Sequence, residues 1–126
     1  ADYEEATALC LKMGMRDCKE LREARIIRWC DKGLFAADLA TLATLGAVLP
    51  ALKYLDLTET SGSAGLYGVQ RLAEGLVTGS LPAVTDLFIG SMHVGVAGAS
   101  ALAAALDRGA MPRLKVLVLA DAGIRD

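Results

Sequence analysis

The residue types that carry most catalytic chemistry are few and scattered in this chain of 126 residues. The single histidine, His93, falls in a stretch that we expect to be a loop between a strand and a helix. No Ser or Cys accompanies it in a recognisable triad arrangement, and no H-E-x-x-H spacing occurs. A general base needs such partners, so a solvated loop residue is the better interpretation of His93. The chain is therefore predicted not to be an enzyme.

Two short glycine-containing stretches have a composition that phosphate-binding loops share. They are G-S-A-G (Gly62 to Gly65) and G-V-A-G (Gly95 to Gly98). Neither extends to G-x-x-x-x-G-K-[ST], which cradles the phosphates of a nucleotide, or to the G-x-G-x-x-G of dinucleotide-binding folds. We interpret both as turns that enter helices, and we expect no cofactor.

Cysteine spacing argues against both a disulfide framework and a metal centre. The three cysteines, Cys10, Cys18 and Cys30, are an odd number and form no C-x-x-C pair. We expect reduced thiols, which indicate an intracellular, reducing compartment such as the cytoplasm or an organelle interior.

Composition and charge narrow the class of partner. The length of 126 residues predicts one domain, and a hydrophobic content of 54% with only 5% aromatic residues predicts an aliphatic core. The net charge of −2 gives no reason to expect a nucleic-acid partner. The most apolar stretch, Phe35 to Leu52, contains Asp38 and is shorter than the roughly 20 apolar residues that a membrane span requires. A buried helix is the better interpretation, so direct membrane insertion is not expected.

A repeated phrase indicates which elements build the molecule. Residues Leu72 to Ile89 read LAEGLVTGSLPAVTDLFI, and residues Leu102 to Leu119 read LAAALDRGAMPRLKVLVL. Both contain two Leu residues four apart, then a Pro, then an alternating apolar run. Residues four apart share one stripe of a helix, and alternating residues share one face of a strand. Each phrase therefore predicts a helix followed by a strand.

The strand part of this phrase occurs four times. L-K-Y-L-D-L, V-T-D-L-F-I and L-K-V-L-V-L begin at Leu52, Val84 and Leu114, with spacings of 32 and 30 residues. L-R-E-A-R-I begins 31 residues before Leu52, at Leu21. Helix-favouring residues surround Leu21, but the repeat register favours a strand, with a helix as the alternative. Strands are predicted near residues 24–27, 54–57, 86–89 and 116–119.

Such a unit is stable only when copies stack. One strand and one helix cannot bury their apolar stripes, whereas stacked copies form a wall of parallel strands and a wall of helices. Small residues in ATLATLGAV and GASALAAAL would let neighbouring helices approach closely. Gly79 and Gly109 are expected to cap helix ends, with Pro82 and Pro112 three residues later.

These phrases resemble a known repeat family. L-P-A-L-K-Y-L-D-L followed by G-L-Y-G-V-Q-R-L-A-E-G-L is similar to leucine-rich repeats of the ribonuclease-inhibitor type. The resemblance implies an α/β fold: a right-handed leucine-rich repeat solenoid with parallel strands on the concave face and α-helices on the convex face. It also implies a single domain over residues 1–126 with about four repeats.

The chain departs from that family in its loops. The family carries Asn or Cys three residues after the last Leu of the strand, and here those positions hold Trp29, Thr60, Met92 and Ala122. Trp29 is expected to fill the core beneath a loop, with a role as an interface hot spot as the alternative.

The family binds its partners through the concave strand face, which makes the outward strand residues the candidates. The predicted protein-binding residues are Arg25, Tyr54, Asp56, Asp86, Phe88, Val116 and Val118. Arg25 is expected beside Asp56, as an exposed ion pair worth under about 1 kcal/mol. The apolar members of the set would form a patch, which suggests a binding surface. The alternatives are that another part of the same chain covers the patch, or that the patch has no functional role.

We therefore expect a protein–protein interaction or scaffold module without catalysis, whose partner the sequence does not identify. The alternative is a structural or accessory subunit of a large multiprotein assembly, held through its helical face and its ends. A lesser alternative is a regulator of an enzyme, such as a GTPase-activating leucine-rich repeat protein, which would need a polar constellation on the strand edge.

The repeats are expected to belong to a longer array, because no polar capping repeat is visible and a solenoid needs caps for solubility. The intact mass of the native protein should then lie well above 13.2 kDa. Mass spectrometry of the native protein checks this expectation, and a mass of 13.2 kDa would contradict it.

Overall fold

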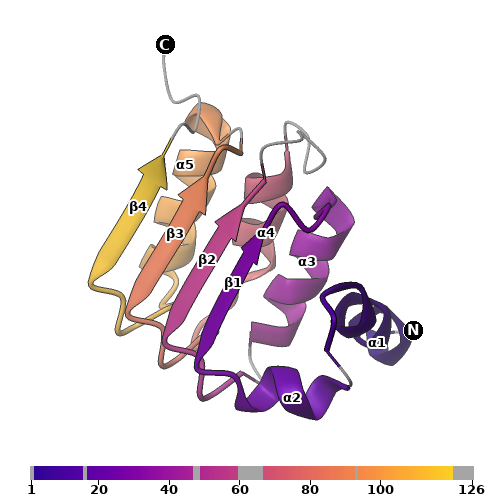
Figure 1. The fold of residues 1–126 in the computed structure, drawn as a ribbon. Helices are drawn as coiled ribbons and strands as arrows, with labels where there is room; N and C mark the ends of the chain where they lie inside the picture. The colour runs from indigo at the N-terminus through magenta and orange to yellow at the C-terminus, as the bar shows by residue number, and fades with distance from the viewer. Residues whose placement is uncertain (1, 16, 47–48, 60–66, 93, 121–126) are drawn as a thin grey trace.

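The described part of the chain is a mixed α/β fold with one open, all-parallel sheet (Figure 1). The computed structural model describes residues 2–15, 17–46, 49–59, 67–92 and 94–120. The strands, side by side in sequence order, are β1 (Ile26–Cys30), β2 (Tyr54–Thr58), β3 (Asp86–Gly90) and β4 (Val116–Ala120). The helices are α1 (Asp2–Lys12), α2 (Cys18–Glu23), α3 (Ala36–Leu45), α4 (Gly68–Gly75) and α5 (Gly95–Asp107).

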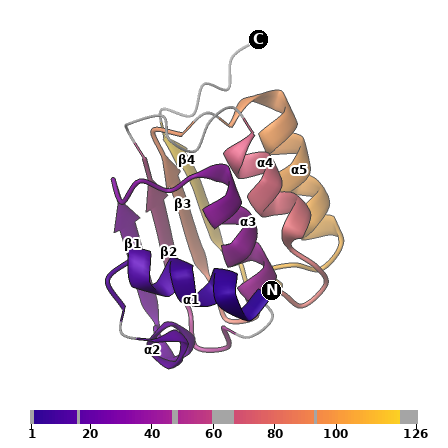
Figure 2. The ribbon, with the colours of Figure 1, turned by 90° about the vertical axis from the view of Figure 1, so that its right-hand side faces the viewer.

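The fold has two layers. Helices α3, α4 and α5 lie side by side over one face of the sheet, and α1 packs beside α3 (Figure 2). Each of α3, α4 and α5 connects one strand to the next parallel strand. No described helix lies over the opposite face, which we call the open face (Figure 2). None of the helices in the described ranges is long and apolar enough to cross a membrane.

The core lies between the layers and is aliphatic, as the composition predicts. In β1, β2 and β3 the second and fourth residues are buried, because alternate side chains of a strand point to the same face. They meet helix residues such as Leu42, Leu72 and Leu102, each at most 2% exposed. Each buried leucine of this kind stabilises the fold by about 1.5–3 kcal/mol.

Small residues bring neighbouring helices together, as the sequence predicts. A Cβ atom placed on Gly75 of α4 would lie 2.7 Å from the Cβ atom of Ala43 in α3. Real Cβ atoms do not approach so closely, so any larger residue at this position would push the two helices apart. The contact requires a glycine on one side and an alanine on the other.

The turns before β3 and β4 use left-handed backbone at equivalent positions. Gly79 and Gly109 have φ angles of 82° and 96°, which glycine adopts without strain. Two residues later, Leu81 and Met111 have φ angles of 50° and 47°, which strain a residue with a Cβ atom. Hydrogen bonds between turns hold them: the Leu81 N–H donates to the Gly46 carbonyl, and the Met111 N–H donates to the Ser80 carbonyl. The predicted glycine at the helix end is confirmed for Gly109, which directly follows the C-cap Arg108 of α5. It is wrong for Gly79, because α4 already ends at Gly75.

Three strands are confirmed near their predicted positions, and the first prediction is wrong in register. β2, β3 and β4 begin at Tyr54, Asp86 and Val116. The segment Cys18–Glu23 is helix α2, so the helix alternative was the correct one there. The Asp17 side chain caps it by accepting a hydrogen bond from the Glu20 N–H, and local helix propensity prevails over the repeat register.

The correction moves β1 by three positions. Ile26 pairs with Tyr54, which separates equivalent residues by 28 positions rather than the 31 that the phrase match implies. Trp29 is therefore a strand residue and not a loop residue. It pairs with Leu57 and is 4% exposed, so its role in filling the core is confirmed.

Replacement of Trp29 tests this register. Trp29→Ala removes a large buried side chain and should lower the free energy of unfolding by about 3–5 kcal/mol. Its neighbour Arg28 points to the open face, so Arg28→Ala should lower it by less than about 1 kcal/mol. Urea denaturation followed by circular dichroism measures both. Equal losses, or a larger loss for Arg28→Ala, would contradict the observed register.

Candidate protein-binding surface

The open face is built from the first, third and fifth residue of each strand. Parallel pairing aligns these residues into rows across the sheet, with neighbouring strands about 4.8 Å apart. The first row is Ile26, Tyr54, Asp86 and Val116, and the second is Arg28, Asp56, Phe88 and Val118. The third row continues with Cys30, Thr58 and Gly90. The sheet therefore brings residues from four separate segments onto one surface.

All the candidate residues except Arg25 lie in these rows. Tyr54, Asp56, Asp86, Phe88, Val116 and Val118 occupy the first two rows. Arg25 is not among them, because β1 starts only at Ile26. The register partner of Asp56 is Arg28, so the predicted pairing of Arg25 with Asp56 is wrong. The three-position shift of β1 accounts for this error.

An arginine and two aromatic rings form a connected group at the centre of the open face. The rings of Tyr54 and Phe88 have centroids 5.3 Å apart and are tilted by 32°. The guanidinium carbon of Arg28 lies 5.2 Å from the centroid of the Tyr54 ring. Such ring pairs are stabilising, and a cation above a ring adds about 0.5–1 kcal/mol at exposed sites. These contacts hold three large side chains in defined positions.

Beside this group the surface is apolar. Phe88 pairs with Val118, and Val116 is 40% exposed in the neighbouring row. We define the open-face patch as Tyr54, Phe88, Val116 and Val118. Ile26, 58% exposed next to Tyr54, extends the apolar surface toward β1. Sequence reasoning missed Ile26, because the shifted register treated it as an inward residue.

Two carboxylates are held on the same face by hydroxyl groups. The Thr58 hydroxyl donates to Oδ1 of Asp56 at 3.0 Å, and the Thr85 hydroxyl donates to Oδ1 of Asp86 at 2.7 Å. Gly90 leaves room for the Thr58 hydroxyl, because a Cβ atom at this position would lie 2.9 Å from the Thr58 Oγ1. Asp86 lies between Tyr54 and Val116 in the first row, so a constrained carboxylate stands within the open-face patch.

The structure describes only some of the candidate chemical motifs of the sequence. Within the described ranges, no group of three His, Cys, Asp or Glu side chains could hold a metal ion. Gly95 to Gly98 forms the first turn of α5, as predicted. His93 and the stretch from Gly62 to Gly65 lie outside the described residues. Cys10 is buried, and Cys30 is an exposed free thiol.

One buried carboxylate was not anticipated. Glu59 follows β2 directly and is 1% exposed, and its Oε2 accepts a hydrogen bond from the Leu34 N–H at 3.1 Å. It joins the loop after β2 to the loop after β1. The pattern of the leucine-rich repeat family places Asn or Cys one position later, at Thr60, which lies outside the described residues. A polar residue two positions after the last strand leucine is the signal that could have found it.

The comparisons with known proteins identify no relative that would suggest a role for this surface. No protein-family model, no curated protein and no solved structure matches this chain.

Glu59 should contribute to stability by satisfying loop backbone. Glu59→Leu leaves the buried Leu34 N–H without this acceptor and should cost about 1–3 kcal/mol, whereas Glu59→Gln keeps an acceptor and should cost less. Glu74→Leu on the exposed side of α4 is the matched control and should stay within about 0.5 kcal/mol. Chemical denaturation of the three variants measures these differences. A Glu59→Leu protein as stable as wild type would show that the bond contributes nothing.

Proposed function

We propose that this chain is a leucine-rich repeat module of the ribonuclease-inhibitor type that binds a protein partner through its open face. In this proposal the strands line the concave side of a solenoid and the helices line its convex side. The module supplies recognition or scaffolding without catalysis, inside a reducing compartment. The exposed free thiol of Cys30 agrees with such a location.

The repeating geometry supports the family assignment. β2, β3 and β4 each begin at the third position of the same L-x-x-L-type phrase, and the intervening helices α4 and α5 pack on the same side of the sheet. Each strand pairs only with its neighbours in sequence order. This nearest-neighbour arrangement is typical of repeat proteins, which build extended binding surfaces from it.

The observation that carries the binding proposal is the open-face patch. Ordinary solvent-facing strand positions are polar, yet Tyr54, Phe88, Val116 and Val118 adjoin one another on a face without a described covering element. Aromatic residues and arginine are enriched in the centres of protein interfaces, and Arg28 lies against Tyr54. Asp86, between Tyr54 and Val116, places a carboxylate within the patch, and Asp56 lies beside Phe88 in the second row. These features together favour a protein as the partner.

A structural role in a larger assembly is the second candidate, and one observation favours it. Leu117 of β4 occupies the inward row of Leu55 and Leu87, which are at most 1% exposed. Leu117 is 39% exposed, so this apolar side chain is available to a neighbouring element or subunit. In this alternative the contacts that matter lie at the β4 end and on the helices.

Charge reversal of the patch tests the proposal. Phe88→Asp with Val118→Asp places two carboxylates in the patch and should abolish capture of a discrete partner from native extract, because charges in an interface core are costly to desolvate. Both residues face away from the core, so circular dichroism should show a folded variant.

The matched control places the same charges outside the sheet, in α5 and in the segment after α4. Val77→Asp with Val96→Asp changes two valines that are 56% and 68% exposed. This control should retain the partner. If the control loses the partner and the patch variant retains it, the open-face proposal fails and the structural-subunit candidate replaces it.

A further inference from the structure

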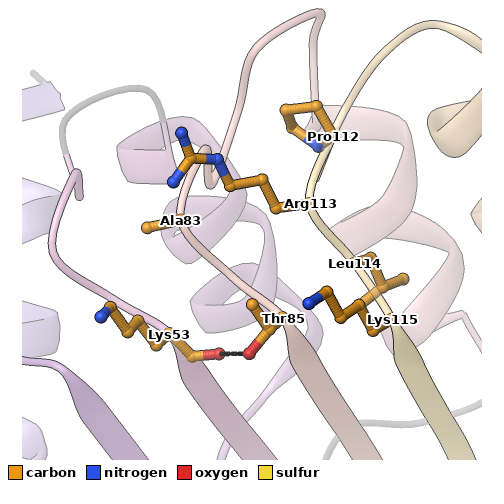
Figure 3. A pocket seen from close by; sticks show the side chains of 7 residues that line it. All are labelled: Lys53, Ala83, Thr85, Pro112, Arg113, Leu114 and Lys115. Atoms are coloured by element: carbon orange, nitrogen blue, oxygen red, sulfur yellow. Dashed lines mark hydrogen bonds between the residues drawn. The ribbon is translucent and has the colours of Figure 1, made fainter.

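A pocket of about 430 Å³ lies at the edge of the sheet where the strands begin. Its lining comes from the segments that lead into β2, β3 and β4, as Figure 3 shows. Three of the lining side chains are cationic and exposed: Lys53, Arg113 and Lys115. The others are Ala83, Thr85, Pro112 and Leu114.

The pocket is basic although the chain carries a net charge of −2. No carboxylate lines it. The nearest acid along the lining segments is Asp86, whose Oδ1 already accepts the Thr85 hydroxyl. Three positive charges around one cavity repel one another unless an anion lies between them, so the arrangement favours anionic ligands.

Backbone hydrogen bonds fix the positions of the residues that carry these cationic side chains. Lys53, Thr85 and Lys115 each directly precede a strand and occupy equivalent positions. The Lys53 carbonyl accepts the N–H groups of Thr85 and Asp86, and the Thr85 carbonyl accepts those of Lys115 and Val116. Lys53 and Lys115 are therefore held two strand spacings apart, about 10 Å. Arg113 reaches from the segment before β4 across toward Ala83 (Figure 3).

The same hydrogen bonds decide which anion fits. Sites for a single phosphate group usually surround it with free backbone N–H groups. Here the backbone N–H groups at the start of β3 donate to the Lys53 carbonyl, and those at the start of β4 donate to the Thr85 carbonyl. Pro112 has no backbone N–H group. Binding must come from long, separated side chains, which suit several carboxylates spaced along an extended chain. Ala83, Pro112 and Leu114 add apolar contact between the charges.

We propose that this pocket binds an acidic, carboxylate-bearing segment of the protein partner. The inference rests on the proposed function, because it assigns a charge to part of the same partner. The strands themselves provide continuity: Tyr54 and Val116 of the open-face patch directly follow Lys53 and Lys115. A partner seated on the patch can extend an acidic segment past the strand starts into the pocket.

A synthetic peptide tests the pocket without the partner. The probe is a fluorescein-labelled octapeptide of alternating Glu and Ser, titrated with the protein in low salt and followed by fluorescence anisotropy. Lys53→Gln with Arg113→Gln and Lys115→Gln should weaken binding by roughly tenfold, because the exposed ion pairs are lost together.

The control triple removes the same charge elsewhere. Lys19→Gln with Arg22→Gln and Lys32→Gln changes three exposed cations outside the pocket, and it should alter peptide binding by less than about twofold if only long-range charge is affected. Equal weakening in both triples would overturn the inference, since general charge would then explain binding. Binding of a phosphoserine octapeptide or of a short single-stranded oligonucleotide in preference to the Glu peptide would overturn it as well.

The peptide experiment and the partner-capture experiment test the two proposals separately. If the partner requires the open-face patch but both triples bind the peptide equally, the pocket assignment is wrong and the proposed function stands. If the peptide requires the pocket while the captured partner does not require the patch, the proposed function is wrong and the pocket remains an acidic-peptide site.

Discussion

The parallel hydrogen-bond register between equivalent strand positions is the constraint on which the rest of this molecule depends. Because side chains alternate across a strand, aligning four strands sorts their residues into inward and outward rows at once. The inward rows bury Ile27, Leu55 and Leu87 beneath the helices. The outward rows assemble the open face. A slip of one position in any strand would exchange the two rows, so the core and the candidate surface are stabilised by the same pairing.

Much of this architecture is predictable from the sequence, and the reason is repetition. Three of the four copies of one phrase predict β2, β3 and β4, since each copy must fit the same neighbours. The first copy escaped this reasoning. Helix α2 occupies Cys18–Glu23, where Asp17 caps a helix-favouring segment, and β1 follows it at a shorter spacing. At this position the Asp17 cap and the helix-favouring residues prevail over the repeat register.

The candidate surface was predictable to the same extent. The period of two identified the outward residues of β2, β3 and β4, but in β1 it selected Arg25 in place of Arg28. Glu59 and the basic pocket could not be predicted in this way. Glu59 is buried by a loop contact with Leu34, and the pocket arises where turns of different repeats adjoin. Neither relation is encoded by the spacing of apolar residues within one repeat.

The single tryptophan lies in β1, at one edge of the sheet. Its fluorescence therefore reports on that edge and not on the whole molecule. In the proposed repeat solenoid, stability is distributed along the array, so neighbouring units can open separately. β1 pairs only with β2, whereas β2 and β3 each pair on both sides. Tryptophan emission therefore follows the unit around β1, while far-ultraviolet dichroism averages over every helix and strand. Coincident transitions from the two signals would describe a cooperative array, and an earlier change in emission would describe fraying that starts at Trp29.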